Sequence, residues 1–127
     1  MVGAKLRRLM KTKIVRYKID TTIDISEHTT VKEVDIPMNG FIREIAVIVP
    51  ALTGAAATVT LAVTDVDDLA LFTQAAIAEG GTTVYQTLNS VNMKLPVAGV
   101  TSFKITASET QTTTDKAVYV VVWLEQS

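Results

Sequence analysis

A chain of 127 residues, 48% of them hydrophobic and 20% charged, is long and apolar enough for one globular domain with a real core, which excludes a disordered polyampholyte. The absence of cysteine excludes disulfides, thiolate metal ligands and cysteine nucleophiles. No apolar run reaches the length of about 18 residues that a transmembrane helix needs, and no apolar segment follows the first basic residues as in a signal peptide. We therefore expect no membrane among its partners.

The formal net charge of −1 is distributed unevenly along the chain. Residues 1–18 contain seven of the twelve basic residues and no carboxylate, whereas the remainder contains all thirteen acidic residues. A basic segment on an acidic body favours docking on an acidic neighbour, such as another copy of the protein. A solvated, frayed terminus is the alternative. The acidic body would repel a long duplex, so we do not expect nucleic acid as a partner.

The N-terminal half of the chain is dominated by period-two alternation. In Val15–Ile25 the odd positions are mostly apolar and the even positions polar, which is typical of a long strand with one buried face. A second strand is predicted over Thr30–Ile36, and Pro37–Gly40 has the composition of a turn. Phe41–Pro50 becomes apolar on both faces, as expected of a central strand.

The middle of the chain continues the same pattern. Ala57–Thr64 alternates valine and leucine with threonine, and a strand over Leu69–Gln74 follows a predicted turn at Asp65–Asp68. Ala75–Gly81 is too short for a stable helix, so we expect one helical turn followed by a loop.

The C-terminal part adds further short strands. They are predicted over Thr82–Leu88 and Val91–Leu95, before a turn at Pro96–Gly99, and then over Thr101–Ala107. After a polar loop, Ala117–Leu124 is an uninterrupted apolar strand.

About eight short strands with almost no helix predict an all-β fold, an antiparallel β-sandwich of jelly-roll-like type. We expect two parts, a basic N-terminal arm over residues 1–12, extended or forming a short helix, and a β-sandwich domain over residues 13–127.

No set of side chains predicts catalysis. His28 is the single histidine and lies in a predicted turn, and the chain lacks a nucleophile elbow of the form G-x-S-x-G. The loops "ALTGAAA" and "AEGGTT" contain glycine but lack the spacing of a phosphate-binding loop, and Gly80-Gly81 is interpreted as a turn with positive φ. We predict that the protein is not an enzyme and has no cofactor.

Asp65, Asp67 and Asp68 form a group of carboxylates within four residues. Calcium prefers such oxygen ligands, but the spacing of an EF-hand is absent. Aspartate also favours turns, because its side chain accepts hydrogen bonds from the local backbone. We predict a turn without a metal, and a calcium site is the open alternative.

Tyr119 and Trp123 occupy the same face of the last predicted strand. Aromatic rings on a solvated face could stack against a carbohydrate. Valines at the neighbouring positions make both faces of this strand apolar, so we expect burial in the core or in an interface.

Several segments together resemble small β-sandwich virion proteins of tailed bacteriophages. These segments are "IPMNGFIREIAVIVPAL", "ATVTLAVTDVDDLALF", "AIAEGGTT", "LPVAGVTSFKITAS" and "AVYVVVWL", in that order, over roughly residues 35–124. The family pattern reads "xxxGYIxxIxxxVP", "VTxTIxD", "xPLxG" and "VxVxLYL". The strongly basic start of this chain has no counterpart in it.

The resemblance implies a non-enzymatic structural protein of the virion, assembled in the host cytoplasm, of the auxiliary capsid or decoration (cement) type. Such proteins form small oligomers, with a trimer favoured, and contact the major capsid protein or other virion subunits. The basic arm would then dock on an acidic capsid or sister-subunit surface. The residues expected to carry this docking are Lys5, Leu6, Arg7, Arg8, Leu9, Met10, Lys11 and Lys13.

A binding module for carbohydrate or a receptor is the alternative function. It predicts a monomer with exposed aromatic rings, whereas the structural role predicts an oligomer that buries apolar faces between copies.

Overall fold

The computed structural model describes residues 13–27, 29–85, 87–88, 91–92 and 94–126, and all regular structure in these ranges is β-strand. The predicted all-β class is therefore confirmed, and the strands pair in the antiparallel sense. The strands are β1 (Lys13–Asp20), β2 (Val31–Val49), β3 (Thr58–Thr64), β4 (Ala70–Ala78), β5 (Gly81–Tyr85), β6 (Thr87–Leu88), β7 (Val91–Asn92), β8 (Leu95–Ala107) and β9 (Tyr119–Gln126).

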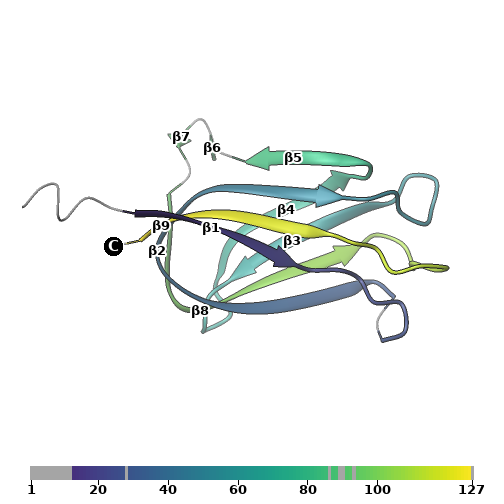
Figure 1. The fold of residues 1–127 in the computed structure, drawn as a ribbon, viewed down its shortest axis with the longest axis horizontal. Coiled ribbons are helices and arrows are strands. Elements are labelled where there is room, and N and C mark those ends of the chain that lie inside the picture. The colour runs from purple at the N-terminus through teal and green to yellow at the C-terminus, as the bar shows by residue number, and fades with distance from the viewer. Residues whose placement is uncertain (1–12, 28, 86, 89–90, 93, 127) are drawn as a thin grey trace, which may run out of the picture.

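Seven strands form one hydrogen-bonded network in the order β1-β9-β2-β8-β3-β4, with β5 also paired to β2. The long strand β2 takes part in two layers. Its first part, Val31–Ile42, pairs with β8. Its second part pairs with β5 over Ile45–Val49 and, on the other side, with β9 over Gly40–Ile48. Figure 1 shows β2 running along one layer, bending at one end of the molecule and returning in the other layer. The result is the predicted antiparallel, jelly-roll-like β-sandwich.

The prediction of a turn at Pro37–Gly40 is wrong, because β2 continues through these residues without a break. Gly40 pairs with Val97 of β8 on one side and Gln126 of β9 on the other, at a φ of 137°. This glycine therefore marks the bend between the layers rather than a chain reversal. Pro37 is tolerated because the described strands pair with this part of β2 on the β8 side only, as at an edge.

Two other predictions, a turn at Pro96–Gly99 and a helical turn with a loop at Ala75–Gly81, are also wrong, because both segments are mainly strand. Pro96–Gly99 lies inside β8 and pairs with β2 over its whole length. Most of Ala75–Gly81 belongs to β4, where Ala76 has a φ of 56° and the register with β3 shifts, as in a β-bulge. Turn-forming residues thus mark bends and bulges in this fold as well as chain reversals.

The first strand ends at Asp20, five residues before the predicted end at Ile25. The Asp20 carboxylate accepts hydrogen bonds from the backbone N–H of Thr22, at 2.9 Å, and from its hydroxyl group. Such local side-chain bonds compete with the strand ladder. Ile23 therefore forms only an isolated bridge with Lys116.

The core fills the space between the two layers. The inward positions predicted from alternation are confirmed in β3 and β8, where Leu61, Phe103 and Ile105 are fully buried. Tyr17 and Ile19 of β1 also pack against the core. Full burial of a large apolar side chain stabilises a fold by about 1.5–3 kcal/mol, so these residues supply the main driving force for closing the two layers.

Candidate partner interface

The two outer faces of the sandwich have different chemistry. On the layer of β8, β3 and the first part of β2, many outward residues are polar, although Val31, Ala62 and Val100 also lie on this side. Ser102 donates a hydrogen bond to Asp35 there at 2.6 Å. We call this surface the threonine face. Its residues are Glu33, Asp35, Thr58, Thr60, Thr64, Ser102, Lys104 and Thr106.

The other layer carries an outer face on which charged residues lie beside apolar and aromatic ones, which we call the aromatic face. It is built by β1, β9, the end of β2 and β5, whose opposite sides face the core. Its residues are Arg16, Lys18, Asp20, Glu44, Ala46, Ile48, Thr82, Val84, Tyr119, Val121 and Trp123.

Strand register arranges these residues in rows across the sheet. One row runs Lys18, Val121, Ala46 and Val84, from β1 to β5, and the next runs Asp20, Tyr119, Ile48 and Thr82. A third, shorter row contains Arg16, Trp123 and Glu44. The rows bring together residues from four strands that lie far apart in the sequence.

Cations from β1 lie over the aromatic rings of β9. The Arg16 guanidinium carbon is 5.7 Å from the Trp123 ring centroid, and Lys18 Nζ is 4.4 Å from that of Tyr119. At such distances the ring quadrupole attracts the cation. Tyr119 and Trp123 are half-buried, and Val121 between them is only 1% exposed. The two aromatic residues thus lie on an outer face and cover the smaller residue between them.

The far side of the aromatic face is open. Val84 of β5 is 50% exposed, and Ile48 beside it in β2 is half-buried. Ala46, between Val84 and Val121 in the same row, is only 4% exposed. The exposed apolar surface on this side therefore comes mainly from Val84, because the neighbours of Ala46 cover it.

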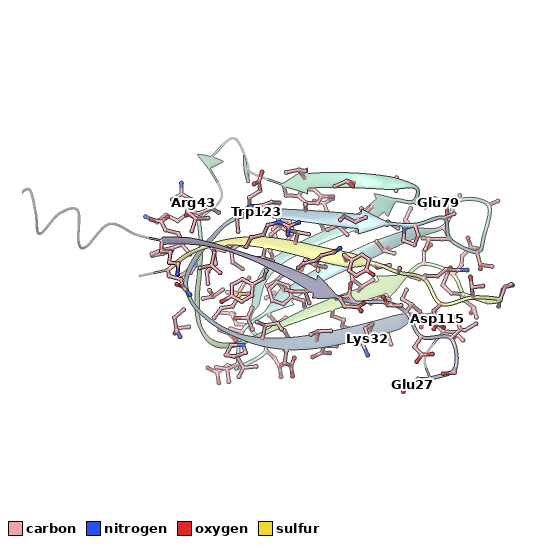
Figure 2. The ribbon with its side chains drawn as sticks, in the orientation of Figure 1. Glu27, Lys32, Arg43, Glu79, Asp115 and Trp123 are labelled. Carbon is pink, nitrogen blue, oxygen red and sulfur yellow. The ribbon has the colours of Figure 1, made fainter. Side chains whose placement is uncertain are left out.

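Acidic loops gather at one end of the sandwich. Figure 2 shows Glu27, Lys32 and Asp115 at the end opposite Arg43. A shallow hollow of about 230 Å³ lies there, lined by Asp20, Thr22, Asp24, Lys32 and Asp115.

The carboxylates of this hollow order its loops. Asp24 Oδ1 accepts hydrogen bonds from the backbone and hydroxyl of Ser26, at 2.9 and 2.6 Å, and Asp115 Oδ1 accepts one from the Ile25 N–H at 3.1 Å. Hydrogen bonds from the Thr22 hydroxyl and backbone, with smaller contributions from the charges of Lys32 and Lys18, lower the pKa of Asp20.

The turn predicted at Asp65–Asp68 is confirmed. Asp65 Oδ1 accepts hydrogen bonds from the backbone N–H groups of Asp67 and Leu69, at 2.8 and 2.9 Å. Asp68 adopts a φ of 60°, and its N–H bonds to the Asp65 carbonyl oxygen. In the described residues, no three His, Asp or Glu side chains are grouped as a metal site would require.

The turn with positive φ predicted at Gly80 is confirmed. Gly80 has a φ of 77° and donates a hydrogen bond to the carbonyl oxygen of Val49. In the other glycine loop, a side chain at Gly54 would overlap the carboxylate of Glu109. His28 lies outside the described residues. No helix of the described chain is long and apolar enough to cross a membrane.

Sequence reasoning did not single out Gln111, a buried residue in the segment before β9 that was described only as a polar loop. Its side chain is fully buried, accepts a hydrogen bond from the Thr53 N–H at 2.7 Å, and donates to the carbonyl oxygens of Thr53 and Glu109. The amide therefore joins two loops, and local composition contains no signal for such a long-range contact.

The residues predicted to dock a partner are only partly described. Lys13 is the first residue of β1, exposed and in register with Gln126. Lys5, Leu6, Arg7, Arg8, Leu9, Met10 and Lys11 lie outside the described residues, as does the rest of the arm.

Comparison with known proteins finds no match among protein-family profiles and none among curated sequences. Among solved structures, the chain is similar to one in the capsid asymmetric unit of cyanophage Pam1, with a TM-score of 0.58 and 19% identity, covering 93% of this chain and 88% of that one. It is also similar to a chain in the capsid of Ralstonia phage GP4, with a TM-score of 0.54 and 20% identity, covering 93% and 86%. The protein therefore has the fold of a chain in two phage capsids, as its resemblance to phage virion proteins predicted.

Proposed function

We propose that the protein is a structural, non-enzymatic component of a phage virion, and specifically a capsid decoration protein that stabilises the head lattice. This proposal rests on the fold similarity to chains of two phage capsids, which extends over most of this chain and most of each capsid chain. The aromatic face offers further support, because the exposed Val84 lies there beside the half-buried Ile48, Tyr119 and Trp123, and apolar side chains that gather on one exposed face are typical of a surface that contacts another protein.

The proposed partners are other copies of the protein and the major capsid protein or other virion subunits, joined during assembly in the host cytoplasm. The basic arm over residues 1–12 is proposed as a second contact. Its cations would steer it to an acidic surface, and Leu6, Leu9 and Met10 would anchor it there, with ordering on docking.

Co-sedimentation with shells assembled from the major capsid protein of the same virus tests both the virion role and the docking of the basic arm. The full chain is expected to sediment with the shells and to raise their thermal disruption temperature. Deletion of residues 1–11 should weaken binding, whereas Thr110→Ala, at an exposed position of the sandwich, should leave it unchanged. Absence of wild-type binding would contradict the virion role, and full binding without residues 1–11 would contradict the role of the arm.

A carbohydrate- or receptor-binding module is the second candidate, because Tyr119 and Trp123 lie on an outer face. A stacking platform for a sugar needs open ring faces, but Arg16 and Lys18 lie over these rings. The arrangement therefore favours a protein partner over a sugar. Binding of oligosaccharides to the isolated chain, lost in Trp123→Ala and retained in Val100→Ala, would reverse this preference.

A further inference from the structure

The turn between β3 and β4 carries the most exposed large hydrophobic side chains of the described residues. Val66 and Leu69 are each 63% exposed, above every other such side chain in that part of the chain. Apolar side chains that remain in water at one place on a surface are typical of a contact with another chain.

The turn itself does not require these two apolar side chains. Asp65 closes it by accepting hydrogen bonds from the backbone N–H groups of Asp67 and Leu69, and Asp68 supplies the positive φ of 60°. The side chains of Val66 and Leu69 take no part in this hydrogen bonding. Because the turn is already ordered, a partner that covers them loses little conformational entropy on this side of the contact.

We infer that the turn Asp65–Leu69 binds the N-terminal segment, residues 1–12, of a neighbouring copy of this chain. The inference rests on the proposed function, in which this segment docks on an acidic surface, and deepens it by naming that surface. Its support is the match in charge, the match in apolar side chains, and the end of the sandwich from which both partners extend.

The charges of the segment and the turn are opposite. Residues 1–12 contain no carboxylate, and their cations are Lys5, Arg7, Arg8 and Lys11. In the turn, Asp67 and Asp68 are exposed, and within the described part of the chain neither carboxylate accepts a hydrogen bond or forms an ion pair. Exposed ion pairs are weak and are screened by salt, so the charges chiefly steer the segment to the turn.

The strands beside the turn keep this corner acidic. Neither β3 nor β4 contains a charged residue. Thr64, the last residue of β3, pairs with Ser102, which donates its hydrogen bond to the exposed Asp35. Lys104, the cation of β8, lies two residues farther from the turn, opposite Glu33. A basic segment that approaches the turn therefore meets carboxylates first.

The segment also contains apolar side chains that match those of the turn. Leu6, Leu9 and Met10 lie between its cations. Contact of these side chains with Val66 and Leu69 removes apolar surface of both partners from water. This burial, rather than the exposed charges, would hold the segment in place once it has docked.

The segment and the turn extend from the same end of the sandwich. Lys13 begins β1 in register with Gln126, which pairs with Gly40 at the bend of β2. β3 runs antiparallel to β8, which starts at this bend, so β3 ends toward it. Figure 1 shows β1 starting at the end where β2 bends.

This placement favours exchange between copies. The segment enters the layer of β1 and the turn belongs to the layer of β3, so the segment would have to pass around its own sandwich to reach its own turn. Two copies that meet at these ends bring each segment to the turn of the other copy. Twelve extended residues span up to about 40 Å, which is enough to cross such a contact.

Disulfide cross-linking of full-length chains tests the inference, and the absence of native cysteine makes each introduced thiol unique. Ala4→Cys in one copy is mixed with Ala70→Cys, at an exposed position next to the turn, in another. Under mild oxidation we expect about tenfold more heterodimer than with the control Ala56→Cys, because docking raises the local concentration of the two thiols. Ala56 is an exposed alanine at the other end of β3. Equal yields for the two pairs would overturn the inference.

A charge reversal tests the role of the acidic turn. Adding Asp67→Lys to the Ala70→Cys chain keeps Asp65 to close the turn, and should lower the heterodimer yield by about threefold or more, because like charges then meet. Glu27→Lys makes the same change in net charge at the opposite end of the sandwich and should leave the yield unchanged. High salt should lower the yield of the unmodified pair. A yield that is unaffected by both Asp67→Lys and salt would overturn the electrostatic part of the inference.

Only variants whose far-UV circular dichroism matches that of wild type are compared. Cross-linking confined to single chains that carry both cysteines would overturn the assignment to a neighbouring copy. The cross-linking needs no capsid shell, so its failure in a chain that still sediments with shells would overturn the docking site and leave the virion role intact. Cross-linking by a chain that does not sediment with shells would support the docking site and contradict the virion role.

Discussion

Gly40 of β2 lies directly against the carbonyl oxygen of Glu125 in β9, so closely that a Cβ atom at position 40 would overlap that oxygen. This contact is at the bend where β2 passes from one layer of the sandwich to the other. The Arg43 guanidinium reinforces the same corner through an ion pair with the Glu125 carboxylate at 2.9 Å. The closure of the sandwich therefore depends on a position without a side chain.

Gly40→Ala is expected to lower the free energy of unfolding by about 2–4 kcal/mol, because it adds both backbone strain at positive φ and a clash with backbone atoms. Gly81→Ala is the matched control, since nothing lies within 4 Å of a Cβ atom at position 81 and its φ is not positive. Urea unfolding of the two variants measures the difference. Equal stability would show that the bend does not need glycine.

Gln111→Ala is expected to lower the free energy of unfolding by about 2–3 kcal/mol, because it removes a buried amide and leaves backbone groups of Thr53 and Glu109 without partners. Thr110→Ala, at the exposed neighbouring position, should change stability by less than about 0.5 kcal/mol. Hydrogen exchange of the Thr53 amide provides a local measure. Unchanged protection in Gln111→Ala would contradict the proposed link between the loops.

Asp20 is expected to make stability depend on pH in the acid range. Its pKa in the folded protein lies below the reference value of 3.8, so its contribution is fully present above that value and is lost as the pH falls through the folded pKa. NMR titration of the Asp20 carboxyl measures this pKa directly. Thr22→Val removes the hydroxyl donor and should raise the pKa toward 3.8, whereas Thr60→Val on the threonine face should not.

Asp65→Ala is expected to destabilise the protein by about 1 kcal/mol, because two backbone N–H groups of the turn lose their acceptor. Asp67→Ala, in the same turn, keeps that acceptor and should be close to neutral. Thermal unfolding with calcium and with a chelator is the second measurement. A midpoint that rises with calcium in wild type and not in Asp65→Ala would replace the turn interpretation with a metal site.

The sequence by itself determined the fold class and the core, because side-chain alternation is a local property of a strand. The inward positions of β3 and β8 could be read from Val59, Leu61, Phe103 and Ile105 alone, and the result was correct. The turn at Asp65–Asp68 was equally local, since the aspartate bonds to its own backbone neighbours.

Only the tertiary structure decided where strands bend and which surfaces lie together. Asn39-Gly40 has the composition of a turn, but its glycine is needed because a distant strand, β9, approaches it. The aromatic face combines β1, β2, β5 and β9, and the role of Gln111 depends on a loop 58 residues away. Such contacts join segments that are remote in the chain, so no local pattern of residues specifies them.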